Sequence, residues 1–151
     1  LDYPDTAALD LLSLRLAEEL KGLRLSVPKV TGLCMLIRRD LIQTIGGFDP
    51  RYGLGYCEDD DFCVRAKLAG FDIAVARDVF IHHYGSRTMS DESDNPDDRM
   101  QSNWVVFKEK WGLHLPGPSD IFKEFVAAHE QLVGRRFESE SCYVPIDYER
   151  A

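Results

Sequence analysis

The sequence lacks a long apolar run, a secretory signal pattern and an excess of basic residues. Without a run of about 20 apolar residues, we expect no membrane span in this chain, and we expect it to be cytoplasmic. Lysine and arginine total 18 against 26 acidic residues, for a net charge of −8. Nucleic acids and anionic membranes bind basic faces, so neither is expected as a general partner. A small anionic ligand held by Arg, Lys or a metal stays open.

The sequence also lacks a Cys-x-x-C pair, a phosphate-binding loop with its lysine, and a Ser or Cys nucleophile motif. Its four cysteines are therefore interpreted as reduced core residues of a cytosolic protein. A disulfide framework is the second interpretation. A zinc site is the third, because tetrahedral ligand spacing is absent. The cysteines are Cys34, Cys57, Cys63 and Cys142.

The chain has enough residues and apolar content for one globular domain. It contains 151 residues, of which 44% are hydrophobic and 11% aromatic, and this favours a single domain with a core of its own. The chain begins with Leu1 rather than Met, so we expect a piece of a longer protein. Periodicity, caps and glycines predict helices at 5–21, 38–45, 59–69, 98–110 and 119–135, and strands at 30–37, 71–76 and 79–82.

The strongest chemical signal is the acidic run Glu58–Asp61, which Arg65 follows on the predicted helix. Carboxylates at a helix start are stabilised by its free N–H groups and the positive end of its dipole. One of them can then serve as a proton acceptor or a metal partner. Asp61 and Arg65 lie four residues apart and can pair on one helix face. The alternative is an acidic helix start that only complements the dipole.

The second signal is the segment His82–Thr88. Neighbouring side chains on a strand point to opposite faces, so only one of the two histidines can face a given cleft, where it could bind a divalent metal. Arg87, with the hydroxyl of Ser86, could meet phosphate oxygens. A histidine at a strand end can equally be structural. The polar stretch 86–98 that follows is interpreted either as a lid over a site or as simple disorder.

Taken in order, six segments of residues 8–112 resemble the C-terminal half of family 2 glycosyltransferases, which have the GT-A fold. The resemblance implies an α/β fold with a short mixed sheet and flanking helices, as in half of a nucleotide-diphospho-sugar transferase. It divides the single domain 1–151 into the core 8–112 and a C-terminal helical extension, 113–151. The segments are Thr31–Arg39, Ile45–Asp49, Tyr56–Arg65, Ala69–Phe71, His83–Ser86 and Asn103–Gly112.

The resemblance implies an inverting transfer of a sugar from a nucleotide-sugar donor to an acceptor hydroxyl, as in bacterial polysaccharide or glycoconjugate synthesis. Asp59 corresponds to the base that deprotonates the acceptor, with Glu58 beside it. Asp61 and Arg65 correspond to positions that brace the loop and helix. The remaining assignments are His83, or else His82, for a Mn or Mg ion; Gly32, Ser86 and Arg87 for substrate; and Trp111 for acceptor binding or for packing.

The resemblance leaves one part of the expected enzyme unaccounted for. A complete GT-A domain begins with a nucleotide-binding half and a D-x-D metal motif, and no such half precedes Thr31 here. We therefore expect a fragment of a larger glycosyltransferase, whose metal needs further ligands and whose activity in isolation is open. Apolar surface left uncovered would favour a homo-oligomer. The alternative is a non-catalytic protein-interaction module that retains a remnant of the fold.

Overall fold

The computed structural model describes residues 5–53, 55–83, 95–114, 121–132 and 134–146. The fold is α/β, with a small two-stranded sheet and flanking helices, in agreement with a partial GT-A-like domain. The elements are α1 (Thr6–Glu19), β1 (Arg24–Ser26), α2 (Arg39–Ile45), the 3-10 turn η1 (Pro50–Tyr52), α3 (Glu58–Leu68), β2 (Ala74–Ala76), α4 (Pro96–Trp111), α5 (Ile121–Leu132) and α6 (Ser139–Cys142).

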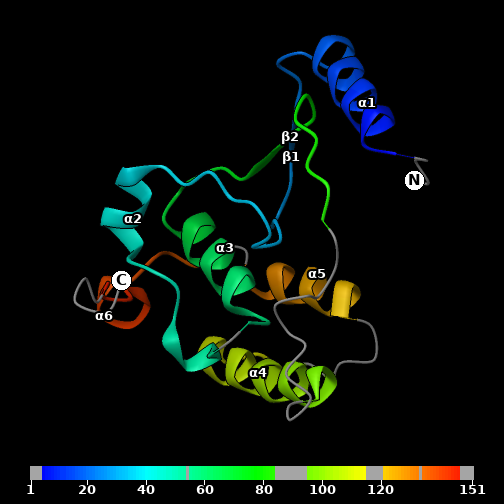
Figure 1. The fold of residues 1–151 in the computed structure, drawn as a ribbon. Coiled ribbons are helices and arrows are strands. Elements are labelled where there is room, and N and C mark those ends of the chain that lie inside the picture. The colour runs from blue at the N-terminus through cyan, green and yellow to red at the C-terminus, as the bar shows by residue number, and fades with distance from the viewer. Residues whose placement is uncertain (1–4, 54, 84–94, 115–120, 133, 147–151) are drawn as a thin grey trace.

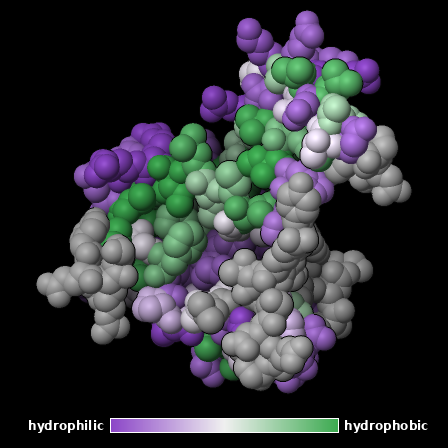
Figure 2. Space-filling view, viewed as in Figure 1, coloured by the Kyte–Doolittle hydropathy of each residue, from purple (hydrophilic) through white to green (hydrophobic). Residues whose placement is uncertain are grey.

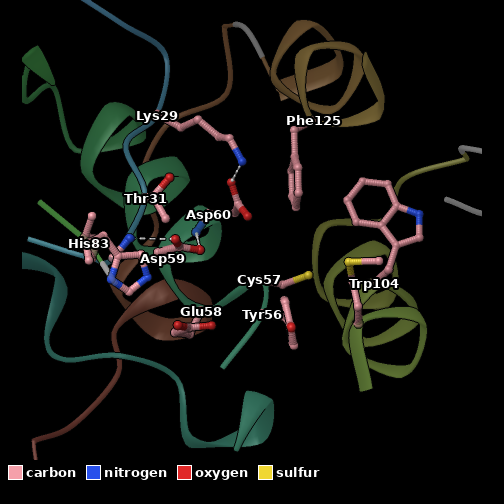
Figure 3. A pocket seen from close by; sticks show the side chains of 13 residues that line it. Lys29, Thr31, Tyr56, Cys57, Glu58, Asp59, Asp60, His83, Trp104 and Phe125 are labelled. Carbon is pink, nitrogen blue, oxygen red and sulfur yellow. Dashed lines mark hydrogen bonds and ion pairs between the residues drawn. The ribbon is translucent and has the colours of Figure 1, made fainter. Parts of the chain in front are cut away.

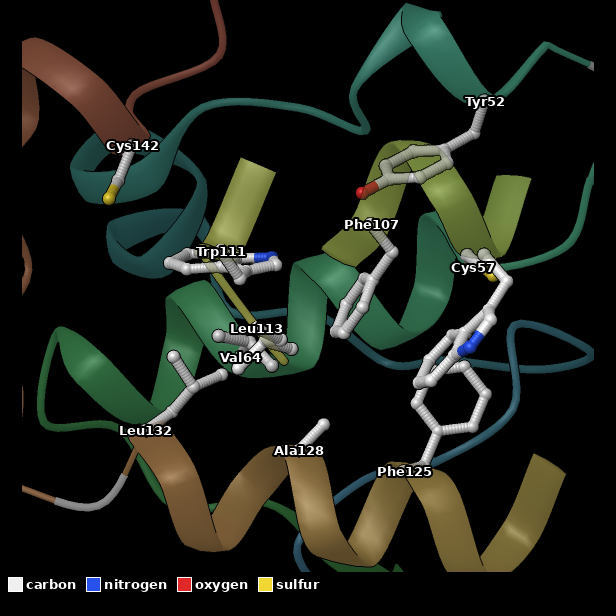
Figure 4. Close-up of a cluster of buried hydrophobic side chains, with 11 residues drawn as sticks. Tyr52, Cys57, Val64, Phe107, Trp111, Leu113, Phe125, Ala128, Leu132 and Cys142 are labelled. Carbon is white, nitrogen blue, oxygen red and sulfur yellow. The ribbon is translucent and has the colours of Figure 1, made fainter. Parts of the chain in front are cut away.

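Helix α3 occupies the centre of the helical part, and α2, α4 and α5 lie around it (Figure 1). Its residue Val64 joins a cluster of aromatic and aliphatic side chains from α4 and α5 (Figure 4). A second cluster forms where α2 meets α3, around Ile45, Phe62 and Ala66. The two clusters bury both sides of α3, so the acidic start of this helix is held by a packed core rather than by its own helix propensity.

The sheet lies away from this core, together with α1 (Figure 1). Strands β1 and β2 are antiparallel, with Leu25 opposite Val75, and all six of their residues are exposed. Helix α1 has no buried residue, although Asp5 caps it by accepting a hydrogen bond from the N–H of Ala8 at 2.9 Å. Among the described residues, no helix combines the length and apolarity that crossing a bilayer requires.

The predicted helices agree with the structure to within a few residues, but the predicted strands do not. Residues 30–37 form no strand. Met35 and Ile37 instead pack against the cluster of α2 and α3, while Leu36 is fully exposed. The apolar character of this run therefore reflects contact with a helix rather than strand pairing. Residues 79–82 form no strand either. Of the predicted strand 71–76, only residues 74–76 are paired, and their partners are residues 24–26, for which no strand was predicted.

The expectation for the cysteines needs one correction. Cys57, Cys63 and Cys142 are buried and free, as expected for reduced core residues, but Cys34 is exposed. The C-terminal extension contains α5 and the short helix α6, and a bridge follows α6 between Gly46 and Val144. The stretch 84–94, the main part of the expected lid or disordered loop, lies outside the described residues, and residues 96–98 begin α4.

Candidate functional site

A pocket of about 440 Å³ opens beside the N-terminal end of α3. One side is polar and carries three carboxylates of the acidic run together with His83 (Figure 3). The other side is aromatic and comes from the turn before α3 and from α4 and α5. The polar side chains are Lys29, Thr31, Glu58, Asp59, Asp60 and His83, and the aromatic ones are Tyr56, Trp104 and Phe125.

Asp59 is held in the pocket wall by two backbone donors. Its Oδ1 accepts a hydrogen bond from the N–H of Asp60 at 2.8 Å, and its Oδ2 accepts one from the N–H of Gly32 at 2.7 Å. Each carboxylate oxygen has two lone pairs, so each retains one for a further partner. A Cβ placed on Gly32 would lie 3.3 Å from the Cβ of Asp59, so this glycine allows the close approach of the two segments. Gly32 thus holds Asp59 and also lines the pocket, and its predicted contact with substrate stays a prediction.

The neighbouring carboxylates have different surroundings. Asp60 is buried and forms an ion pair of 2.5 Å with the ammonium group of Lys29. Burial raises the pKa of Asp60 to about 7; the Lys29 charge opposes this rise, and the Asp59 charge adds to it. Burial also raises the pKa of Glu58, whose Oε2 has no hydrogen-bond partner within the described parts of the chain. Three adjacent acidic residues therefore present three different environments to the pocket.

The raised pKa of Asp60 predicts a pH-dependent contribution to stability. Its folded pKa of about 7 lies above the unfolded value of about 3.9, so folding is favoured most below pH 4, and this contribution is lost as the pH rises through 7. Relative to Asp60→Asn, the wild-type free energy of unfolding should fall by roughly 2–4 kcal/mol between pH 4 and pH 8. Urea titrations of both proteins across this range measure the difference. If the free energies of unfolding of the two proteins changed with pH in parallel, the raised pKa of Asp60 would be contradicted.

Behind the pocket, Asp61 and Arg65 form an ion pair in which neither side chain is exposed. The Nε of Arg65 lies 2.8 Å from the Oδ2 of Asp61, and its two terminal nitrogens donate to the carbonyls of Ile45 and Gly47. The Oδ1 of Asp61 accepts a hydrogen bond from the indole N–H of Trp111 at 3.0 Å. This arrangement ties α3 to the end of α2 and to α4.

A lysine connects this ion pair to a second buried carboxylate. The ammonium group of Lys110 lies 2.7 Å from the Oδ1 of Asp61 and 2.7 Å from the Oδ2 of Asp49. Arg51 also pairs with Asp49. Burial alone would raise the pKa of Asp49, but the hydrogen bonds from Arg51 and Lys110 outweigh it and hold that pKa well below its usual range. The Asp49 carboxylate thus stays charged within a network that fixes the loop before α3.

The structure brings together only some of the other predicted site residues. His83 lines the pocket with Asp59, whereas His82 does not. Ser86 and Arg87 lie outside the described residues. Trp111 does not line the pocket: it is 5% exposed and packs in the core, so of its two predicted roles the structure favours packing over acceptor binding.

The described residues do not form a metal centre by themselves. Within the described part of the chain, no group of three or more His, Cys, Asp or Glu side chains is arranged to hold a metal ion. His83 lines the pocket with Glu58, Asp59 and Asp60, but no three of these side chains are grouped closely enough to hold an ion such as Mg²⁺ or Mn²⁺. A metal at this place would need ligands from elsewhere.

Sequence reasoning missed Lys29, Asn103 and Phe125. Phe125, on α5, lines the pocket, and its ring lies 3.9 Å from the ammonium group of Lys29. Phe125 was predicted only as part of the helix 119–135, and Lys29 lies in a stretch without a motif. The amide group of Asn103 contacts the turn before α3, whereas the sequence marked this residue only as the start of a segment that resembles the family. The contacts of all three residues depend on the folded chain, which brings them to the pocket from separate segments.

Comparison with known proteins places this site in a family. The model of glycosyltransferase-like family 2 matches residues 7–109, which include the acidic run and His83, and the chain therefore belongs to this family. Helix α5 and its Phe125 lie beyond the matched segment. No solved structure matches the chain.

The curated relatives are longer proteins. An uncharacterized protein of Mycobacterium tuberculosis and one of Mycobacterium bovis are each 33% identical over 66 residues, which cover 41% of this chain and 24% of each relative. An uncharacterized protein of Sinorhizobium fredii is 26% identical over 94 residues, covering 61% of this chain and 10% of that protein. The matched segments thus span a quarter or less of these relatives.

Proposed function

We propose that the chain is the acceptor-binding and catalytic-base half of an inverting, metal-dependent glycosyltransferase, with Asp59 as the base. Membership of glycosyltransferase-like family 2 supports glycosyl transfer in general. The observation that carries the finer proposal is the position of Asp59, which is fixed by two backbone N–H groups in the wall of a pocket large enough for a sugar ring. A base must lie within hydrogen-bond reach of the proton that it removes.

In the proposed reaction, a free lone pair of the Asp59 carboxylate accepts the proton of an acceptor hydroxyl. The hydroxyl oxygen forms a bond to the anomeric carbon as the bond from this carbon to the nucleoside diphosphate breaks on the opposite face. The configuration at the anomeric carbon is thereby inverted. Glu58 and the buried Asp60 lie beside the base, and Tyr56, Trp104 and Phe125 bound the opposite side of the pocket.

The proposal assigns His83 as one ligand of a Mn or Mg ion whose other ligands lie outside the described residues. His83 is exposed and lines the pocket beside Asp59, which supports this role. Such an ion would offset the charge that develops on the departing diphosphate. Apart from His83, the described residues of the pocket would then act on the acceptor rather than on the donor.

The test uses the full-length protein that contains this chain, incubated with a panel of α-linked nucleotide sugars and sugar acceptors. Release of nucleoside diphosphate together with a β-linked product, identified by NMR coupling at the anomeric proton, is the expected result. An α-linked product would overturn inversion, and with it the single-base mechanism of Asp59. A panel that gives neither product nor donor turnover would count against the catalytic function as a whole.

A specific observation supports the second candidate, a non-catalytic interaction module that could also self-associate. Large apolar side chains are exposed on α1, on the sheet and on the neighbouring segments, where Figure 2 shows a hydrophobic surface. They include Leu11, Leu14, Leu23, Leu25, Leu33, Leu36, Val75, Val79 and Ile81. Under this alternative the Asp59→Asn variant keeps full function in a partner-binding or oligomerisation assay, whereas Leu25→Asp loses it.

A further inference from the structure

The turn that leads into α3 contains two consecutive residues in the left-handed backbone region, and neither is glycine. Tyr56 has φ of 67° and Cys57 has φ of 71°. Residues that have a Cβ rarely adopt this backbone conformation, and it persists only where surrounding contacts impose it. Both residues line the pocket, and Cys57 is the N-cap of α3, although its side chain makes no capping hydrogen bond. Some other group must therefore hold this turn.

The side chain of Asn103, on α4, supplies that contact. Its Nδ2 donates to the carbonyl of Gly55 at 2.7 Å, to that of Tyr56 at 3.0 Å and to that of Tyr52 at 2.8 Å. Carbonyl oxygens only accept hydrogen bonds, so an amide nitrogen must face all three of them. Two N–H groups serve three acceptors, and one N–H is therefore shared. Asn103 is 7% exposed, so water cannot readily replace it.

The conformation of this turn determines where α3 begins. The carbonyl of Cys57 accepts the first hydrogen bond of the helix, from the N–H of Asp61 at 2.9 Å. Asp59 lies in that first turn, and in this orientation its carboxylate accepts the hydrogen bond from the N–H of Gly32. A change in φ at position 56 or 57 would rotate the first turn of α3 and move the carboxylate out of the pocket wall.

We propose that Asn103 is a positioning residue, which aims the carboxylate of Asp59 by holding Tyr56 and Cys57 in the left-handed conformation. The effect of Asn103 on catalysis rests on the proposed function, but its effect on the position of the Asp59 carboxylate does not. The N–H of Gly32 reports on it directly, because this group donates to Asp59 and is distant from Asn103 in the sequence. When that hydrogen bond is lost, the amide proton resonance of Gly32 moves upfield.

The experiment records amide NMR spectra of the ¹⁵N-labelled chain as wild type and as Asn103→Asp, which has nearly the same shape but no N–H donor. The Gly32 resonance should move upfield in Asn103→Asp. Asn103→Ser is the second variant, for use if Asn103→Asp does not fold. Its single hydroxyl can donate to only some of the three carbonyls, so the Gly32 resonance should move in the same direction by a smaller amount. In the full-length enzyme, kcat should fall while the KM for the donor stays unchanged.

The matched control is Leu113→Ala, which removes core packing just beyond the end of α4 and removes no side-chain hydrogen bond to the turn. It should lower stability and leave the Gly32 resonance in place. A fixed Gly32 resonance in both Asn103 variants would overturn the proposal, as would an equal shift in Leu113→Ala. If Asp59→Asn retained full transfer while Asn103→Asp still displaced the Gly32 signal, the proposed function would fail and the positional effect would stand.

Discussion

Asp59→Asn in the full-length protein should lower kcat for glycosyl transfer by about 10²–10⁴-fold, the usual contribution of a positioned general base. Asparagine has nearly the same shape, and its carbonyl oxygen can still accept the hydrogen bond from Gly32. The protein should therefore fold normally, and its affinity for the nucleotide-sugar donor should stay close to that of the wild type. Initial rates and calorimetric titration of the donor measure the two quantities separately.

The matched control is Asp72→Asn, which makes the same chemical change at a carboxylate whose side chain is 94% exposed. It should retain wild-type kcat. Glu58→Gln tests the neighbouring carboxylate and should have a smaller effect than Asp59→Asn. Wild-type turnover by Asp59→Asn would exclude Asp59 as the base, and a large loss in Glu58→Gln alone would transfer the role to Glu58.

The sequence was sufficient to locate the five predicted helices because their signals are local, but it missed α6 and began α4 two residues late. Asn95 and Pro96, assigned to the polar stretch, in fact begin α4: Asn95 accepts a hydrogen bond from the N–H of Asp97 at 3.1 Å, and Pro96 occupies the first turn. Gly112 ends the helix with φ of 58°. Each of these residues acts within a few positions of itself. The same is true of the acidic start of α3, which the sequence identified as the centre of the site.

The strands could not be found in this way. Strand β1 has three residues, too few for an alternating pattern, and it forms only because β2 pairs with it from 50 residues further along the chain. Conversely, the apolar segment 30–37 has the composition of a buried strand, but it packs against α2 and α3. A short apolar run does not reveal whether its partner is a strand or a helix.

The same distinction between local and distant contacts applies to the site. The acidic run and His83 were identified because their residue types form a recognisable order. The Lys29 ion pair with Asp60 and the aromatic wall at Phe125 depend on contacts between residues 31 or more positions apart. The Asn103 contacts link residues 47 to 51 positions apart. Such contacts have no signature in a single sequence, so the chemistry of Asp59 could be predicted and the means of holding it in place could not.

The ion pair behind the pocket carries the largest expected effect on stability. Asp61→Leu should lower the free energy of unfolding by about 3–5 kcal/mol, the usual cost of removing one partner of a buried ion pair. The guanidinium of Arg65 has no exposed surface, and Asp61 is its carboxylate partner among the described residues. The substitution would leave this buried charge with only the carbonyl oxygens of Ile45 and Gly47. Urea unfolding at pH 7 measures the loss.

The double variant Asp61→Leu, Arg65→Met separates the charge effect from the packing effect. It removes both charges, so it should recover part of the stability that Asp61→Leu loses, because replacing a whole buried ion pair by apolar side chains is often close to neutral. Asp40→Asn, at an exposed pair with Arg38, should leave stability unchanged.

A domain of this size is stable by only about 5–15 kcal/mol, so Asp61→Leu alone removes a large fraction of the total. Equal stability of Asp61→Leu and wild type would show that the pair does not hold α3 in place, and the support for Asp59 would then have to come from the turn before the helix.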